Sequence, residues 1–154
     1  MASGTPPDAQ FVERVRASFR RQQVMQLLGA TLTSITPGHV EITLPFRGDL
    51  TQQHGFLHAG IVTAICDSAC GYAALSLMPP QTGVLSIEYK VNLLAPARGD
   101  RFLARGRVLR AGRTIVVCAG DVYAQATALA SEEILVATML ATMAVIRDRP
   151  DVSD

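Results

Sequence analysis

Two hydrophobic periods follow one another along the chain of 154 residues. Between positions 8 and 28, apolar side chains recur at helical spacing with arginines between them, which predicts one amphipathic helix on the surface. Gly29 stands where a helix commonly ends. Apolar and polar side chains then alternate over 39–46, which predicts a strand, and the turn signal Pro37-Gly38 before it predicts that 30–36 and 39–46 form a hairpin.

The alternation is clearest in LSIEYKVNL, residues 85–93. A regular strand would place its odd-numbered apolar residues on one face and Ser86, Glu88, Lys90 and Asn92 on the other. Further strands are predicted over 100–110 and 114–125, joined by a hairpin turn. In the last apolar run, ILVATMLATMAVI, the content of Val, Ile and Thr favours a strand over a helix.

The stretch HGFLHAGIVTAICDSACGYAALSLM, residues 54–78, is almost continuously apolar. A membrane span is the alternative to a core helix here, but Asp67 lies in its middle and no Lys or Arg flanks it. We therefore predict a core helix and no membrane association. A sheet curled around this helix would bury nearly all its sides, and a second copy of the chain would cover the remaining stripe.

Composition restricts the classes of protein that fit the chain. Apolar residues make up 49% and charged residues 18%, as in a globular protein, and the net charge of +1 gives no reason to expect nucleic acid. The N-terminus lacks the features of a secretory signal, and three cysteines, an odd number, fit reduced thiols in a cytoplasmic protein. We predict one domain over 10–147, with flexible tails at 1–9 and 148–154.

Asp67 is the chemical anomaly of the apolar stretch. Its neighbours one helical turn away are small and uncharged, so no cation on the helix compensates its charge. Such a carboxylate needs a raised pKa or a specific polar partner. Both a catalytic aspartate and a structural aspartate held by a backbone donor or a distant arginine fit this pattern.

The loop before the helix carries polar groups and glycine, and it leads directly into Ala59 and Gly60. A helix start presents unpaired N–H groups that hold the oxygen of a polarised carbonyl as negative charge develops on it. Asp67 lies about 12–14 Å further along the same helix by its rise per residue. The two features would work together only if antiparallel helices from two subunits met, which makes the chain an obligate dimer.

The segment QQHGFLHAGIVTAICDSA resembles the signature of hotdog-fold acyl-CoA thioesterases of the phenylacetate-degradation type. That signature reads Asn-x-x-Gly-x-x-His-Gly-Gly, with an acidic residue nine places after the His, and His58 and Asp67 have this spacing. LSIEYKVNLLAPAR resembles the family's strand bearing a positioning Ser, which Ser86 matches. VLRAGRT resembles the hairpin near the coenzyme's phosphates, which implies substrate contacts from Arg110 and Arg113.

The resemblance covers residues 28–147 and implies an α+β hotdog fold. In this fold an antiparallel sheet of about six strands wraps around one long central helix, here with an extra N-terminal helix. The implied activity is hydrolysis of an aromatic or short- or medium-chain acyl-CoA, without a cofactor, by a homodimer or a dimer of dimers.

The same resemblance implies roles for individual residues. Asp67 would act as general base or nucleophile, and the N–H of Ala59, with Gly60 beside it, would polarise the carbonyl. Gln52 would take the place of the orienting Asn, and His58 would fix the loop at the helix start. The remaining loop residues His54 and Gly55 are placed with the substrate. Ala59 and Gln52 both depart from the family pattern, where Gly and Asn stand.

Other functions remain open from the sequence. His54 and His58 have the spacing of zinc ligands on a helix, but Gly55 lies between them and H-E-x-x-H is absent, so no metal site is predicted. Arg110 and Arg113 fit an ordinary solvated hairpin as well as a phosphate site. A non-catalytic acyl-CoA-binding protein and an enoyl-thioester hydratase or dehydratase of the same fold are the alternative functions.

Overall fold

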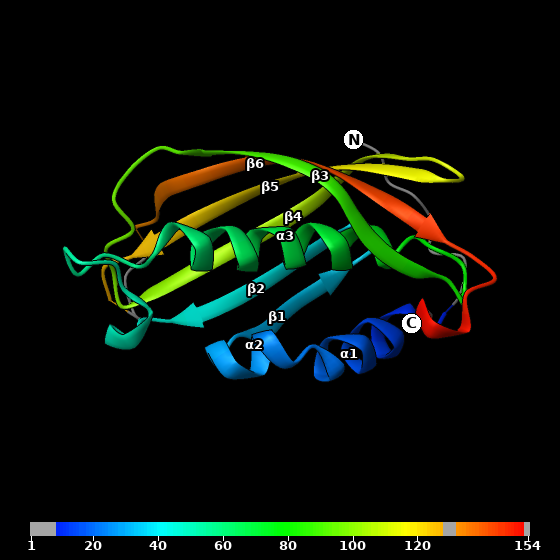
Figure 1. Ribbon diagram of the computed structural model, residues 1–154, viewed down its shortest axis with the longest axis horizontal. Coiled ribbons are helices and arrows are strands. Elements are labelled where there is room, and N and C mark those ends of the chain that lie inside the picture. The colour runs from blue at the N-terminus through cyan, green and yellow to red at the C-terminus, as the bar shows by residue number, and fades with distance from the viewer. Residues whose placement is uncertain (1–8, 128–131, 153–154) are drawn as a thin grey trace.

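The computed structural model describes residues 9–127 and 132–152, and within them six strands form one antiparallel sheet around a long helix (Figure 1). The sheet order is β1-β2-β4-β5-β6-β3. This arrangement confirms the predicted hotdog fold. The strands are β1 (Thr31–Thr36), β2 (His39–Pro45), β3 (Gly83–Leu93), β4 (Arg101–Ala111), β5 (Ile115–Gln125) and β6 (Ile134–Ile146).

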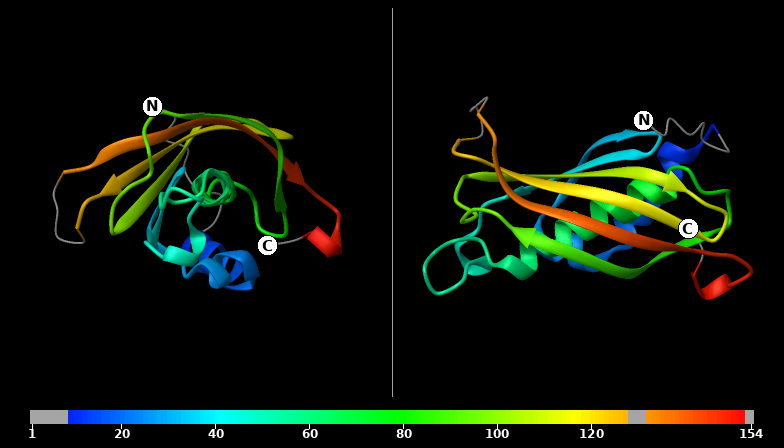
Figure 2. Two further views of the ribbon diagram at one scale, coloured as in Figure 1. Left: turned by 60° about the vertical axis from the view of Figure 1, so that its left-hand side comes forward. Right: turned by 90° about the horizontal axis from the view of Figure 1, so that it is seen from above.

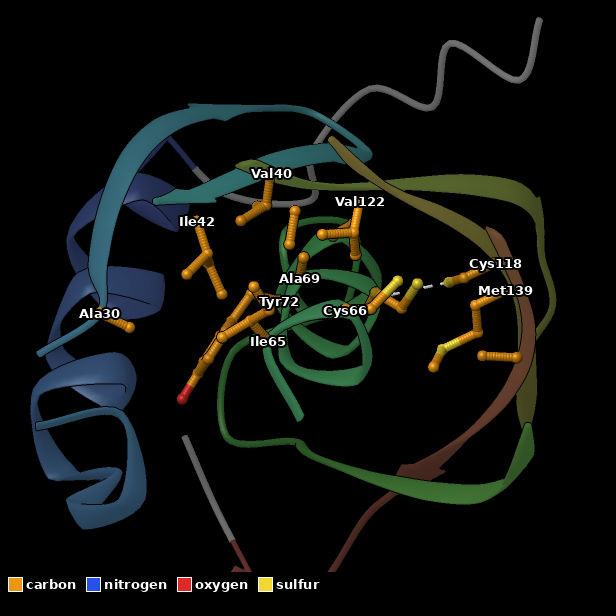
Figure 3. Packing of buried hydrophobic residues seen from close by; sticks show 14 of the residues in the cluster. Ala30, Val40, Ile42, Ile65, Cys66, Ala69, Tyr72, Cys118, Val122 and Met139 are labelled. Carbon is orange, nitrogen blue, oxygen red and sulfur yellow. Dashed lines mark hydrogen bonds between the residues drawn. The ribbon is translucent and has the colours of Figure 1, made fainter. Parts of the chain in front are cut away.

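The central helix α3 (Ala59–Leu75) lies in the concave face of the sheet, which arches over it (Figure 2). Glycines in β4 and β5 allow this close approach: a Cβ on Gly106 would lie 2.3 Å from the backbone carbonyl of Ala69. A Cβ on Gly120 would lie 2.7 Å from the sulfurs of Cys66 and Cys70. The side of α3 that bears Cys66 faces the sheet (Figure 3), so these thiols are core residues.

The N-terminal segment forms two helices, where the sequence pattern predicted one. They are α1 (Phe11–Arg21) and α2 (Gln23–Leu28), and the backbone is extended at Gln22 between them, with ψ of 91°. The Gln22 side chain turns inward and bonds two residues of α3, which a continuous amphipathic surface helix would not allow. Both helices lie on the open side of the arch (Figure 2), and Gly29 ends α2 in the left-handed conformation, as predicted.

A β-bulge changes the direction of side chains along β3. Ser86 pairs with Met143 and Glu88 pairs with Thr142, so Ile87 is an extra residue without a partner on β6. The strict alternation predicted for residues 85–93 is therefore wrong at this point. Ser86 turns to the inner face, where its hydroxyl lies 3.4 Å from the buried Met143 sulfur, whereas Glu88 faces outward and accepts a hydrogen bond from Thr142.

Strand β3 also forms an edge of the sheet, and it is poorly covered in the single chain. The side chains of Ile87 and Leu93 are 56% and 54% exposed. An edge strand with exposed apolar side chains is a ready template for pairing with another strand. The single chain therefore leaves apolar side chains along β3 uncovered.

Within residues 9–127 and 132–152, two short 3-10 helices complete the structure, η1 (Gly48–Leu50) before the α3 loop and η2 (Pro150–Val152) near the C-terminus. Within the segment predicted as the C-terminal tail, the Val152 carbonyl lies so close to Gly83 that a Cβ there would be 2.2 Å from it. The predicted N-terminal tail falls, apart from Ala9, outside the described residues. Among the described helices, none has the length and apolar content needed to cross a membrane.

Candidate active site

Asp67 lies halfway along α3, on the side of the helix that the sheet leaves half-buried. The Ser86 hydroxyl donates a hydrogen bond of 2.7 Å to its Oδ1 atom, which the bulge in β3 makes possible. Desolvation raises the pKa of Asp67 above its usual value, and the weaker effect of the Ser86 hydrogen bond lowers it. A carboxylate with a raised pKa is a stronger base than a fully solvated one.

A pocket of about 290 Å³ opens beside this carboxylate. Residues of α1, α3, β3 and the α1–α2 junction line it: Ser18, Arg21, Gln22, Asp67, Ser68, Gly71, Tyr72, Val84 and Ser86. The sequence pattern gave no indication that the N-terminal helices reach this pocket, because only the break at Gln22 turns a polar surface position inward.

The start of α3 provides the second part of the site. His58 is the N-cap residue, and its Nδ1 atom accepts a hydrogen bond of 2.9 Å from the Gly60 N–H. Nδ1 is therefore unprotonated in this arrangement, and the Gly60 N–H is occupied. Within the described residues the Ala59 N–H donates to no other group, so Ala59 supplies the available donor at the helix start.

The loop before α3 is a tight turn that places Gln52 near Ala59. The Gln52 N–H donates to the Phe56 carbonyl at 2.9 Å, and Gly55, with φ of 81°, closes the turn by donating to the Gln52 carbonyl at 3.0 Å. The Gln52 side-chain oxygen accepts from the His54 N–H. Gln52 and Ala59 line the same pocket of about 470 Å³.

The other residues predicted to bind substrate lie further out. Gly55 lines an adjoining pocket of about 650 Å³, where the Arg98 guanidinium lies 5.1 Å from the centre of the Phe56 ring. His54 is exposed, with its Nε2 atom 3.3 Å from the side-chain nitrogen of Gln53. The sequence pattern does not identify Arg98 as a site residue, because only the tertiary structure places it over an aromatic ring.

Arg110 and Arg113 are exposed at the β4–β5 hairpin. The base of this hairpin lies at the end of α3: the Val108 N–H donates to the Gly38 carbonyl, and the Gly38 N–H donates to Ser76, which follows α3. The structure therefore places both arginines at the end of α3 opposite to Ala59.

One chain does not bring the predicted catalytic residues together. Asp67 and Ser86 share one pocket, Gln52 and Ala59 share another, and neither pocket contains a residue of the other pair. Eight residues of helix separate Ala59 from Asp67, which corresponds to about 12 Å along the axis. Within one chain, the pocket with the carboxylate therefore lacks the helix-start N–H donor, and the pocket with the donor lacks the carboxylate.

Metal and thiol chemistry find little support in the described residues. They contain no group of three or more His, Cys, Asp and Glu side chains that could hold a metal ion. Burial raises the pKa of Cys118 to about 12, and the pKa of Cys70 is also raised, chiefly by its thiol neighbour Cys66 and by burial. These thiols are protonated at neutral pH and fill the core.

Comparison with known proteins places the chain in a family. The sequence model of the thioesterase superfamily matches residues 54–131. A thioesterase family protein of Silicibacter pomeroyi is 48% identical, and its crystal structure covers 89% of this chain and 98% of its own with a TM-score of 0.85. Human acyl-coenzyme A thioesterase 13 is 26% identical over 75% of this chain and 83% of its own length.

More distant structures share the fold. The PaaI protein from the phenylacetic acid degradation operon of E. coli is 19% identical, with a TM-score of 0.77 over 89% of this chain and 94% of its own. The family match includes the helix start and Asp67, the residues around which both halves of the candidate site are built. The chain therefore belongs to the thioesterase superfamily and is a thioester hydrolase with the hotdog fold.

Proposed function

We propose that the chain hydrolyses acyl-CoA thioesters at sites that two subunits share. The observation that carries this proposal is the division of the site within one chain: a desolvated carboxylate at Asp67 and an available N–H at Ala59 lie on one helix, in separate pockets. Two antiparallel copies of α3 would place the Asp67 of one subunit opposite the Ala59 of the other.

The surface of the single chain supports such pairing. The side of α3 that the sheet leaves open carries small residues between its start and the carboxylate, among them Gly60 and Ala64. Small residues let two helix backbones approach closely. Next to this side, edge strand β3 has unpaired backbone groups and exposed apolar side chains, which pairing with a second β3 would cover. This geometry supports the proposed homodimer, and a dimer of dimers is the alternative assembly.

The chemistry requires only a base and an oxyanion donor, because a thiolate is a good leaving group. The thioester carbonyl oxygen accepts from the Ala59 N–H at the positive end of the α3 dipole. Asp67 of the partner either removes a proton from water as that water attacks the carbonyl carbon, or attacks the carbon itself to form a mixed anhydride that water then hydrolyses. The C–S bond then breaks, the thiolate takes up a proton, and the acid is released. Ser86 orients the carboxylate through its hydrogen bond.

The substrate class rests on the resemblance and on the relative named acyl-coenzyme A thioesterase 13. Aromatic or short- or medium-chain acyl groups are proposed, in a cytoplasmic enzyme that needs no cofactor and binds no nucleic acid. In an antiparallel pair, the hairpin bearing Arg110 and Arg113 lies at the same end as the partner's α3 start, where it would meet the phosphates of the coenzyme.

A mixing experiment tests the shared site. Ala59→Pro removes the backbone N–H at the first position of α3, where proline is well tolerated, and the extended backbone of His58 suits a following proline. Asp67→Asn removes the carboxylate. Each variant alone should be inactive toward acyl-CoA, whereas unfolding and refolding them together should restore about a quarter of wild-type thiol release, since half the dimers are mixed and each has one intact site.

Two results would contradict the proposal. Mixed variants that stay inactive, although wild-type chains refolded in the same way regain activity, would rule out the shared site. Binding of acyl-CoA without steady thiol release by the wild type would favour a non-catalytic acyl-CoA-binding protein. Addition of water to crotonyl-CoA would favour the hydratase alternative.

A further inference from the structure

The pocket beside Asp67 ends against the N-terminal helices, and the residues there are polar. The Gln22 side-chain amide donates a hydrogen bond of 3.2 Å to the Ser68 hydroxyl, and its carbonyl oxygen accepts one of 3.2 Å from the Tyr72 hydroxyl. Ser68 and Tyr72 are only 7% and 6% exposed. Gln22 therefore brings a hydrogen-bonding group to a partly buried end of the pocket that contains Asp67.

Gly71 provides the space in this pocket. It lies inside α3, where glycine is less favourable than alanine, and its φ is not positive. A Cβ built on it would meet no atom within 4 Å, so packing within the chain does not require glycine. Because Gly71 lines the pocket one turn beyond Asp67, its missing side chain leaves room for a group bound next to the carboxylate.

The two arms of a thioester place different demands on the space around the reacting carbonyl. The coenzyme arm is long and must extend to the surface, whereas the acyl arm needs only a cavity of its own size. The pocket at Asp67 is bounded by α1–α2, α3 and β3, and its 290 Å³ is small for a ligand site. It suits the acyl arm, and the apolar pocket at Ala59 and Gln52 suits the start of the coenzyme arm.

From these observations we infer that Gln22 and Gly71 determine acyl specificity, and that the enzyme prefers short acyl groups bearing a hydrogen-bonding substituent. This inference rests on the proposed function. The Gln22 amide has a second N–H and its oxygen a second lone pair, so it can bond a hydroxyl or keto group of the substrate. An alkyl group of the same size would leave this second N–H and second lone pair without a partner.

The test compares two CoA thioesters of equal size, β-hydroxybutyryl-CoA and isovaleryl-CoA, in which a hydroxyl replaces a methyl group. We expect wild-type kcat/KM to be at least about tenfold higher for the hydroxylated substrate. Gln22→Leu should lower this ratio about tenfold. The control Gln23→Leu changes an exposed neighbour that does not line the pocket, and it should keep the wild-type ratio.

Gly71→Ala separates pocket filling from loss of folding. It should raise the melting temperature, because alanine favours the helix and meets no atom, while it lowers kcat/KM for isovaleryl-CoA and β-hydroxybutyryl-CoA more than for acetyl-CoA. Three results would overturn the inference while leaving the proposed function intact. They are a wild-type ratio of the two kcat/KM values near one, a ratio in Gln22→Leu equal to that of wild type, and a Gly71→Ala effect of the same size on all three substrates. Absence of hydrolysis of every thioester tested, octanoyl-CoA included, would instead remove the proposed function and the inference with it.

Discussion

Replacement of Asp67 by Asn should affect activity and stability in opposite directions. The asparagine keeps the shape of the side chain and an oxygen that can accept the Ser86 hydrogen bond, but it has no charge. Loss of a general base typically reduces the rate by about 10²–10⁴. This range corresponds to about 2.7–5.4 kcal/mol of lost transition-state stabilisation. Steady-state thiol release from acyl-CoA measures it, and near-normal turnover would remove Asp67 from the mechanism.

The stability of the same variant follows from the raised pKa of Asp67. The folded chain holds this proton more tightly than the unfolded chain, so the free energy of unfolding falls as pH rises from the ordinary value of 3.8 through the raised one. Above the raised pKa the deficit is complete, and Asn, which does not ionise, lacks it. Each pKa unit corresponds to about 1.4 kcal/mol, and each kcal/mol to about 2–4 °C in melting temperature for a chain of this size.

Calorimetry should therefore give Asp67→Asn a higher melting temperature than wild type at pH 7, and the difference should be smaller at pH 4. Asp121→Asn is the matched control. Its carboxylate accepts from Thr138 and pairs with Arg107, both at 2.7 Å, on the outer side of β5. This substitution should keep activity and should not stabilise the chain. A melting temperature of the Asp67 variant equal to or below that of wild type at pH 7 would refute the desolvation argument.

Three further predictions concern the elements that hold the site. Ser86→Ala removes the hydrogen bond that lowers the pKa of Asp67, so the acidic limb of the kcat/KM profile should move to higher pH; an unmoved limb would exclude this coupling. Gly106→Ala would place a Cβ 2.3 Å from the α3 backbone, where ordinary contact begins at 3.4 Å. Thermal unfolding should therefore show a loss of about 1–3 kcal/mol in stability. The control Gly48→Ala, whose Cβ would meet no atom within 4 Å, should show no such loss. Ile87→Arg on edge strand β3 should shift the sedimentation coefficient to that of a monomer and abolish thiol release; an active dimer would exclude pairing through β3.

The sequence was sufficient for the elements whose signals are local. Period-two alternation identified β2, and the Pro37-Gly38 turn identified β1 as its hairpin partner. The content of Val, Ile and Thr identified β6, and a continuous apolar run with a single carboxylate identified α3. These signals succeed because an element that packs on one side repeats its apolar residues at its own period, whatever its partners are. The unusual position of Asp67 was visible for the same reason, since every residue within a helical turn of it is uncharged.

Tertiary structure decided which side chains meet at the site. The sequence places Ser86 on the polar face of its strand, and only the bulge at Ile87, formed by pairing with a strand about fifty residues away, turns its hydroxyl to Asp67. The helical pattern of 8–28 continues through Gln22, and only packing against α3 breaks the helix there and brings the amide into the pocket. Local periodicity sets which residues are buried, whereas long-range pairing sets the direction in which they point, and the chemistry of this enzyme depends on direction.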